Sequence, residues 1–415
     1  MTYSLVTFGC RVNQADSLAI ERELRSRGAI AAPPDEADVV IVNTCSVTAS
    51  ADQGARQTIR RVVRRNPGVR VIVTGCYATR RPDQLRDLPN VARVISNSDK
   101  DDLVVRIASE IGLTTASRYG AGDGPCGAPL EPGVAGRTAF TLRVQTGCDE
   151  RCSYCIIPTT RGTSRSHPLG EVLRQIERAV AAGYKEIAIT GVHLGSYGRD
   201  LAEPASLTML VERLSEWPGD VLFRISSLEP MDCTPEIVAL AARSPRIAPH
   251  FHLPLQHASD EVLGAMRRPY RFCDYARLVE SLRAQIPHAS IGSDIIVGFP
   301  GESDAHFEEM RQALEGLPLT HLHVFPYSDR PDTDASARPQ KVDGAAVRAR
   351  GRQVRAIGEA MARRFKDSQA GTTRRALTVD DGWSAVTDNY LKVRLDQQHP
   401  RNEWIEVWLK PNATI

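Results

Sequence analysis

The stretch "TGCDERCSYCIIPTTRG", residues 146–162, places Cys148, Cys152 and Cys155 in a C-x3-C-x2-C pattern. Closed structural zinc sites have four protein ligands, and simple ferredoxin-type clusters have four thiolates. Three closely spaced thiols therefore indicate a metal site with one coordination position left open. An open position generally serves chemistry, because a substrate or cofactor can bind the metal there.

The residues that follow this stretch predict a parallel α/β barrel. After AFTLRVQTG, helical patterns alternate with apolar runs that are expected to form strands, namely EIAITGV, VLFRISSL, HFHLPL, IGSDIIVGF and HLHVFPY. Five or six repeats of strand and helix are typical of a parallel (β/α) barrel, complete or partial, rather than of a doubly wound sheet. Active residues of such a barrel are expected at the carboxyl ends of its strands.

The first hundred residues predict a separate parallel α/β sheet. Three β-branched runs, SLVTF, DVVIVNT and RVIVTG, alternate with helical patterns, and a cysteine follows each run: Cys10, Cys45 and Cys76. Loops at the carboxyl ends of parallel strands meet at one edge of the sheet, so these cysteines are expected to lie together. A cysteine after a strand is more often a small buried apolar residue. Three successive occurrences favour a shared metal or cluster.

Composition indicates an ordinary soluble protein. Hydrophobic residues make up 42% and charged residues 25% of the chain. No apolar run approaches the length of a membrane span, and the N-terminus lacks the features of a signal peptide, so the sequence predicts a cytoplasmic location and no membrane partner. In that compartment the nine cysteines are better explained as metal ligands or catalytic thiols than as disulfides.

Positive charge is concentrated in two parts of the chain. Residues 1–100 hold 15 Lys and Arg against 10 acidic residues, and residues 336–375 hold 11 against 3. This pattern suits a polyanionic partner that contacts both ends of the chain. One predicted helix carries a broad basic face, made of Arg56, Arg60, Arg61, Arg64 and Arg65. The alternative is a solvated helix face.

The chain is expected to divide into five segments. Residues 113–137 are rich in Gly, Pro, Ala and Ser and predict a linker, in which Cys126 is interpreted as an incidental thiol. Residues 373–415 show alternation broken by turns, as in a small antiparallel β module. The predicted segments are the N-terminal domain 1–112, the linker 113–137, the barrel 138–335, a basic helical segment 336–372 and the β module 373–415.

The three-cysteine stretch resembles the cluster-binding loop of the radical S-adenosylmethionine superfamily. The cysteine spacing carries the resemblance, and the aromatic Tyr154 before the last cysteine also fits it. In that superfamily three thiolates hold a [4Fe–4S] cluster, and its free iron binds the amino and carboxylate groups of S-adenosylmethionine. The alternative, a zinc site completed by a histidine such as His167, does not account for the barrel pattern.

The two halves of the chain together resemble the methylthiotransferase family. The motifs that carry this resemblance are FGCRVNQADS, VNTCSVT, TGCYA and GCDERCSYCIIPTTRGTSRS, and it covers nearly the whole chain. It implies two [4Fe–4S] clusters, a radical-SAM partial barrel and a C-terminal β module that binds nucleic acid. It also implies six catalytic metal ligands, three for an auxiliary cluster and three for the radical cluster: Cys10, Cys45, Cys76, Cys148, Cys152 and Cys155.

Further stretches resemble the branch that modifies threonylcarbamoyladenosine beside the tRNA anticodon. They are GCRVNQ, TGVHLGSYG, RISSLEP, FHLPLQHAS, SDIIVGFPGES and LHVFPYSDR. The resemblance implies a methylthio group added at C2 of that nucleoside, the tRNA anticodon loop as partner, and an electron donor such as flavodoxin or ferredoxin. The alternatives are methylthiolation of isopentenyladenosine or of a ribosomal protein, and, in a different class, a non-catalytic zinc-containing RNA-binding protein.

One departure from the family concerns the C-terminal module. It is short, and residues 376–415 hold 4 basic against 6 acidic residues. The basic segment 336–375 is therefore expected to contribute more of the contact with tRNA than the module does.

Other polar residues are candidates for the cofactor site. Five are expected to hold S-adenosylmethionine, although most of them could equally be capping or turn residues: Tyr154, Ser226, Ser227, Gln256 and Asp294. Two histidines are candidates for lining the cavity, and two asparagines could either donate to cluster sulfur or stabilise turns: His193, His257, Asn13 and Asn43. Two remaining cysteines have no partner spacing and are interpreted as inert: Cys233 and Cys273.

Overall fold

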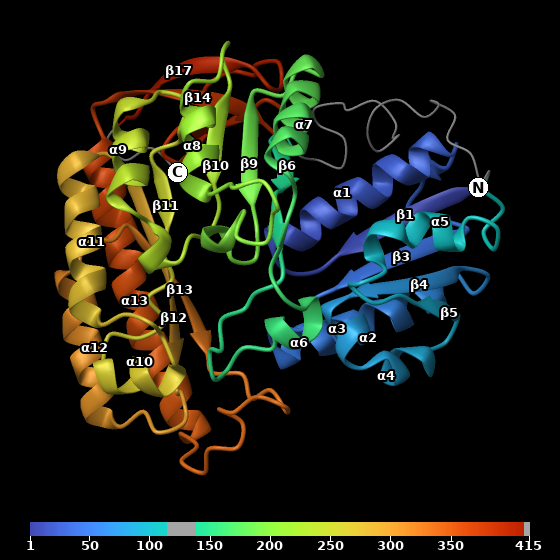
Figure 1. Cartoon of the computed structure of the whole chain (residues 1–415), viewed down its shortest axis with the longest axis horizontal. Helices are drawn as coiled ribbons and strands as arrows, with labels where there is room; N and C mark the ends of the chain where they lie inside the picture. The colour runs from blue at the N-terminus through green and yellow to red at the C-terminus, as the bar shows by residue number, and fades with distance from the viewer. Residues whose placement is uncertain (114–137, 411–415) are drawn as a thin grey trace.

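The computed structural model describes residues 1–113 and 138–410 (Figure 1). The predicted linker 113–137, apart from its first residue, and its Cys126 lie outside the described residues. The described chain is α/β, with a parallel sheet near the N-terminus, a central (β/α) domain with two three-stranded parallel sheets, and a C-terminal antiparallel sheet. The predicted fold class is confirmed.

The N-terminal sheet has five parallel strands in the order β2-β1-β3-β4-β5. Its strands are β1 (Thr2–Thr7), β2 (Ile30–Ala31), β3 (Val39–Thr44), β4 (Arg70–Gly75) and β5 (Val91–Val94). Its helices are α1 (Arg11–Ser26), α2 (Ala49–Arg65), α3 (Cys76–Arg80), α4 (Pro82–Arg86) and α5 (Leu103–Ile107). Side chains of α1 and α5 pack on one face, and those of α2, α3 and α4 on the other. The β-branched runs are continuous because both faces are buried.

Six parallel strands in two sheets form the partial barrel. Their orders are β10-β9-β6 and β11-β12-β13. The strands are β6 (Phe140–Arg143), β9 (Glu186–Thr190), β10 (Leu222–Ile225), β11 (His250–His252), β12 (Ser290–Val297) and β13 (His321–Pro326). A bridge between Phe223 and Ile247 joins the sheets. In the described chain β6 and β13 do not pair with each other, so the barrel is open between these edges.

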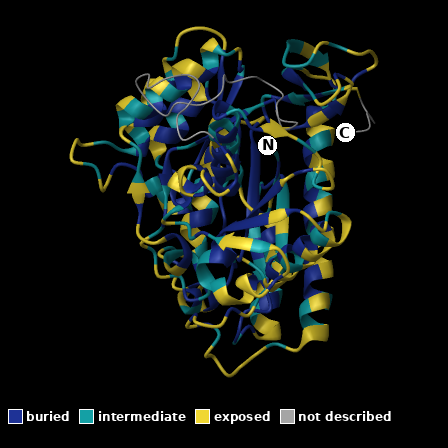
Figure 2. Cartoon of the chain, turned by 90° about the vertical axis from the view of Figure 1, so that its right-hand side faces the viewer, coloured by how far each residue is buried: buried dark blue, intermediate teal, exposed yellow. Residues whose placement is uncertain are grey.

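Helices cover the outside of the barrel. The outer layer contains α7 (Leu169–Ala181), α8 (Leu207–Ser215), α9 (Pro235–Arg243), α11 (Phe272–Gln285), α12 (Asp304–Gly316) and α13 (Gly344–Gln369). The barrel's core lies between this layer and the strands. Figure 2 shows the buried strands in dark blue and the outward helix faces in yellow. Shorter elements are α6 (Ile157–Arg161), α10 (Asp260–Met266), β7 (Gln145–Thr146), β8 (Arg165–Ser166) and the 3₁₀ turns Lys100–Asp102, Leu194–Ser196 and Pro230–Asp232.

The C-terminal sheet is antiparallel, in the order β16-β15-β14-β17. Its strands are β14 (Thr373–Val379), β15 (Ser384–Thr387), β16 (Lys392–Arg394) and β17 (Trp404–Trp408). It bonds to residues that lead into barrel strands: Asn389 Nδ2 donates to His288 O at 2.9 Å, and Asn402 Nδ2 donates to Gly183 O at 2.8 Å. The module therefore covers the amino-terminal end of the barrel, at the top of Figure 1.

Among the helices of the described chain, none combines the length and the apolarity that crossing a membrane requires.

Candidate functional site

The cysteines of the quoted stretch lie in one loop at the carboxyl end of β6. Cys148, Cys152 and Cys155 occupy the turn between β7 and α6. Burial raises the pKa of Cys155 to about 12, and the neighbouring thiols of Cys152 and Cys148 act in the same direction. A free thiolate is therefore unfavourable here, whereas a bound metal would compensate its charge.

Donors surround these thiols. The backbone N–H of Ile157 donates to Cys155 Sγ at 3.5 Å, and Arg268 Nη1 donates to Cys152 Sγ at 3.3 Å. His193 Nδ1 lies 3.9 Å from Cys148 Sγ. Such contacts orient thiolate ligands and reduce the charge on sulfur.

The donor side chains are themselves held in place. Asp232 Oδ2 lies 2.7 Å from Nε2 of His193, and Arg268 forms an ion pair with Glu229. Burial opposes a charged imidazole, but the hydrogen bonds to Asp232 and to Cys148 raise the pKa of His193 to about 10.

The three cysteines of the N-terminal sheet meet at its carboxyl edge. Cys10 is the N-cap of α1, Cys45 follows β3, and Cys76 begins α3 directly after β4. The sheet order places β1, β3 and β4 side by side. Gly9 has a φ of +89°, and a Cβ on it would lie 2.7 Å from Cys45 Sγ. The approach of the first loop to the second therefore requires glycine.

The second triad has its own burial and donors. Burial raises the pKa of Cys45 to about 12, and the nearby thiols of Cys76 and Cys10 add to the shift. The N–H of Val47 donates to Cys45 Sγ, and Asn97 Nδ2 donates to Cys76 Sγ, both at 3.5 Å. This environment, like that of the first triad, suits metal-bound sulfur.

Thiol spacing tests which metal the triads fit. Among the described residues, one group of possible ligands has all its ligand atoms within 4.8 Å of one another, and it is His252, Asp294 and His323. Neither cysteine triad meets that limit. Thiolates on one tetrahedral zinc would be about 3.8 Å apart, as Zn–S bonds of about 2.3 Å require. The wider spacing fits an iron–sulfur cluster, in which each thiolate binds a different iron.

Helix α6 connects the two triads. It begins two residues after Cys155 and ends at Arg161, whose Nη2 lies 2.5 Å from Asn13 Oδ1 in the N-terminal domain. Asn97 Nδ2, which donates to Cys76, also donates to Thr160 O at 2.9 Å. A single turn of helix therefore contacts residues beside both triads.

A buried charge network accompanies this contact. Asp16 on α1 pairs with Lys100 at 3.0 Å, Arg143 at 2.6 Å and Arg161 at 3.1 Å. The Asp16 side chain is 1% exposed. Burial alone would raise the pKa of this carboxyl, but the three cations hold it well below its usual range. Two of the cations come from the barrel, so the network joins the two domains.

The amide N–H groups of the two predicted asparagines donate to oxygen atoms rather than to sulfur. Asn13 Nδ2 donates to Phe8 O at 2.8 Å and to Thr44 O at 2.9 Å. Asn43 Nδ2 donates to Asn13 O at 2.8 Å. These bonds support the alternative that the two amides stabilise the turns that carry the cysteines.

The predicted cofactor residues lie at or near the carboxyl ends of the barrel strands. Ser226 directly follows β10, and its buried hydroxyl has no hydrogen-bond partner among the described residues. Ser227 is exposed. Gln256 lies beyond the end of β11, and its N–H donates to the carbonyl oxygen of Asp294 on β12 at 2.8 Å. Tyr154 packs edge-on against Phe299, with ring centroids 6.5 Å apart. Their binding role stays a prediction.

The other histidines and cysteines separate into different environments. His193 contacts Cys148, whereas His257 is fully buried and its Nε2 lies 3.7 Å from Glu302. His167, the candidate fourth zinc ligand, contacts Glu171 at 3.5 Å on α7. Cys233 is buried and Cys273 is exposed.

Several site residues were not singled out from the sequence. They are Asp16, Lys100, Arg161, Glu229, Asp232, His252, Arg268 and His323. Arg161 stands within the quoted stretch and could have been suspected there. Asp16, Glu229, His252 and His323 also stand in the stretches that carry the family resemblance, but no local pattern assigns any of these residues a contact, because tertiary packing alone creates it.

Comparison with known proteins agrees with this architecture. Residues 2–96 match the model described as "Uncharacterized protein family UPF0004", and residues 142–314 match that of the Radical SAM superfamily. A TsrM radical S-adenosylmethionine methyltransferase from Kitasatospora setae has a TM-score of 0.57 at 18% identity, over 81% of this chain and 77% of that one. That likeness concerns the fold alone.

Relatives that are more than 30% identical over most of their length are informative about the family. The threonylcarbamoyladenosine tRNA methylthiotransferase of Thermotoga maritima is 38% identical over 81% of this chain and 76% of its own. The corresponding Aquifex aeolicus protein is 33% identical over 95% and 96%. A tRNA-2-methylthio-N6-dimethylallyladenosine synthase of Streptomyces avermitilis is 32% identical over 91% and 76%.

A barrel with the radical S-adenosylmethionine match, preceded by an α/β domain with its own cysteine triad, defines a radical S-adenosylmethionine methylthiotransferase. Enzymes of this superfamily use S-adenosylmethionine and a [4Fe–4S] cluster. The chain belongs to the threonylcarbamoyladenosine tRNA methylthiotransferase family. The alternative of a non-catalytic zinc-containing RNA-binding protein is thereby excluded.

Proposed function

We propose that this enzyme places a methylthio group on C2 of N6-threonylcarbamoyladenosine beside the anticodon of tRNA. The observation that carries the proposal is the pair of cysteine triads, in two domains joined through α6, in a chain of this family. The second candidate substrate is the dimethylallyl nucleoside, because a synthase for it is 32% identical.

Each triad would hold one [4Fe–4S] cluster. Cys148, Cys152 and Cys155 would hold the cluster that binds S-adenosylmethionine, and the N-terminal cysteines would hold an auxiliary one. When bound, these groups supply the one-electron chemistry that breaks the unreactive C2–H bond and the sulfur and methyl that replace the hydrogen.

Protein groups near the radical triad would control its charge and orientation. Arg268 donates to the Cys152 thiolate, and Glu229 holds the guanidinium in place. His193, oriented by Asp232, faces Cys148. We assign the cofactor's ribose and amino-acid groups to the polar residues at the strand ends, namely Tyr154, Ser226, Ser227, Gln256 and Asp294. Ser226 supports this assignment with a buried hydroxyl that no described residue satisfies.

The basic face of α2 is the proposed contact for tRNA in the N-terminal domain. Arg60, Arg61, Arg64 and Arg65 are exposed, whereas the Arg56 guanidinium lies 5.5 Å from the Tyr77 ring centroid.

The proposed division into domains keeps the segments 1–112, 138–335, 336–372 and 373–415. The reductant would be a small electron carrier such as flavodoxin or ferredoxin.

Anaerobic reconstitution with iron and sulfide tests the proposal. The protein should bind about eight irons, and a variant with alanine at the three radical cysteines about four. With S-adenosylmethionine and reductant it should methylthiolate tRNA that carries threonylcarbamoyladenosine, as measured by mass spectrometry of nucleosides. Product on dimethylallyladenosine tRNA alone would favour the second candidate. Zinc without iron would refute the cluster assignment.

A further inference from the structure

Four histidines line the inside of the barrel. His250 and His252 alternate on β11 with Phe251, which packs in the hydrophobic core between the strands and the outer helices. His321 and His323 alternate on β13 with Leu322 and Val324, which pack against the same core. The neighbouring imidazole rings have centroids 5.1 to 6.4 Å apart. Since residues at i and i+2 of a strand share a face, these rings point to the interior.

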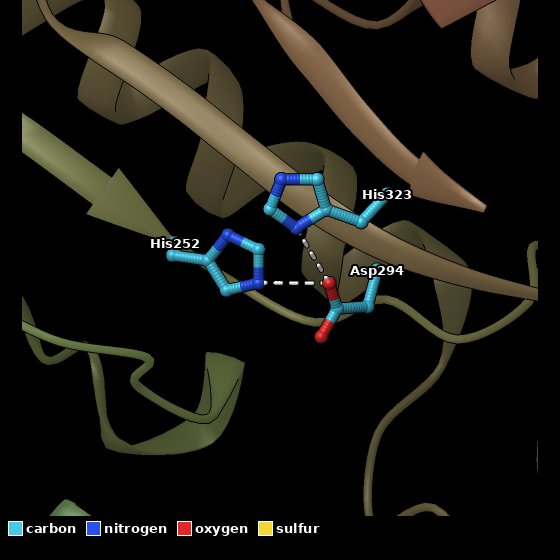
Figure 3. Close-up of side chains that lie close together, drawn as sticks. All are labelled: His252, Asp294 and His323. Carbon is cyan, nitrogen blue, oxygen red and sulfur yellow. Dashed lines mark hydrogen bonds and ion pairs between the residues drawn. The ribbon is translucent and has the colours of Figure 1, made fainter. Parts of the chain in front are cut away.

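Asp294 joins two of these histidines. It lies on β12, between the two histidine-bearing strands, and its Oδ1 lies 2.9 Å from His252 Nε2 and 3.3 Å from His323 Nδ1. Figure 3 shows both rings turned toward this carboxylate. Within the described residues, no hydrogen bond engages His252 Nδ1 or His323 Nε2. The hydrogen bond to Asp294 also raises the pKa of His323, which favours its cationic form.

The first histidine strand leads to the radical triad. Beyond β11 the chain reaches Leu255, whose carbonyl accepts from the Tyr270 hydroxyl at 3.1 Å. Tyr270 accepts from Arg268 Nε at 3.0 Å, and Arg268 donates to Cys152. His252 is therefore three residues from a bonded path to the radical cysteines.

The second histidine strand leads to the N-terminal triad. Beyond β13, Ser328 Oγ accepts from the Ala49 N–H at 3.1 Å, and Arg330 donates to Ser46 Oγ at 2.7 Å. Ser46 is the neighbour of Cys45. β13 is also an open edge of the barrel, and the His323 side chain is 56% exposed. The His323 side chain is therefore accessible to a ligand.

The chemistry of the substrate places its side group close to the reacting carbon. In adenine, C2 and C6 are both bonded to N1, so a substituent on N6 that points toward N1 lies on the same edge of the base as C2. A threonylcarbamoyl group carries a carboxylate and a hydroxyl, whereas a dimethylallyl group is apolar. A row of imidazole rings can form hydrogen bonds with the threonylcarbamoyl group. Against the dimethylallyl group, the ring nitrogens would be buried without a hydrogen-bond partner.

We propose that His252 and His323, positioned by Asp294, bind the carboxylate of the threonylcarbamoyl group and so select that nucleoside over the dimethylallyl one. The inference rests on the proposed function and names the specificity contact within it. Asp294 accepts from both rings through one oxygen, and when both rings are imidazolium ions the second nitrogen of each donates to the ligand's carboxylate.

Binding of short RNAs to the cluster-loaded enzyme tests this contact without turnover. The probes are an anticodon stem-loop with threonylcarbamoyladenosine and the same RNA with its carboxylate as a methyl ester. Wild type should bind the acid at least about tenfold more tightly, as expected for a charge-assisted hydrogen bond. His323→Phe should bind both equally. His288→Phe, the same change at an exposed histidine, should keep the preference.

Each outcome decides the proposal. Equal binding of acid and ester by wild type overturns it, even if threonylcarbamoyl tRNA is methylthiolated, which tests the proposed function separately. One equivalent of zinc or manganese that is lost in His323→Phe also overturns it, because the group would then be a metal site. If His323→Phe fails to fold, as judged by circular dichroism and iron content, His252→Gln should reduce the preference. An unchanged preference in His252→Gln overturns the proposal.

Discussion

The buried carboxylate of Asp16 gives the sharpest stability prediction. Asp16→Asn keeps the size of the side chain but removes the one charge shared by Lys100, Arg143 and Arg161. The exposed fractions of the Asp16, Lys100 and Arg161 side chains are 1%, 2% and 2%. The variant therefore leaves buried cations without their counterion.

The size of the effect follows from this burial. Removing one partner of a buried ion pair costs about 3–5 kcal/mol. Because the amide still accepts one hydrogen bond, we expect about 3 kcal/mol, or somewhat more than a hundredfold in the opening equilibrium of the N-terminal domain. Asp101→Asn is the matched control: it bonds to the same Arg143 at 2.8 Å but is 71% exposed. It should cost at most about 1 kcal/mol.

Hydrogen exchange of the cluster-free protein, followed by mass spectrometry, measures this cost locally. The slow amides of α1 should exchange roughly a hundredfold faster in Asp16→Asn than in wild type. In Asp101→Asn they should change by much less. Equal acceleration in the two variants would refute the reasoning, since the shared charge would then contribute no more than a surface pair.

Four further outcomes are expected. Because the pKa of Asp16 is depressed in the folded state, the stability advantage of wild type over Asp16→Asn should be constant above about pH 5 and shrink below about pH 4, in urea titrations at several pH values. Gly9→Ala places a Cβ 2.7 Å from Cys45 Sγ, so it should lose about four irons and keep the radical cluster, and full iron content would contradict this. Cys148→Ala should abolish reductive cleavage of S-adenosylmethionine, whereas Cys45→Ala should retain some cleavage and yield no methylthio product by mass spectrometry of the nucleosides. Replacing the four exposed arginines of α2, Arg60, Arg61, Arg64 and Arg65, by alanine should weaken tRNA binding and flatten its salt dependence, with iron content unchanged. Wild-type affinity and salt slope in this variant would mean that the face is solvated and does not contact tRNA.

The sequence was most informative where structure is periodic. Strands β3 and β4 were expected from continuous β-branched runs, and the cysteines that follow them meet because parallel strands end at one edge. The fold class is confirmed on this basis. The cysteine spacing likewise indicates an open metal site.

The parts that the sequence did not predict depend on register between distant strands. Asp294 meets His252 and His323 only because β12 pairs with β11 and β13 in one particular alignment. Arg268 follows α10, far from Cys152 in sequence, and its guanidinium donates to the Cys152 thiol. No local pattern encodes such distances, so single-sequence reasoning could not assign these contacts.

The position of the C-terminal module affects how much RNA the enzyme can contact at once. The module sits at the amino-terminal end of the barrel, and the cysteine loops lie at the other end. The eight residues of β12 separate these ends by roughly 20 Å along the barrel axis. An RNA that contacts both would have to run along the outside of the barrel, and its nuclease-protection footprint would extend beyond the anticodon loop into the paired stem. A footprint restricted to the loop would mean that the module serves as a closure for the barrel and takes no part in holding tRNA.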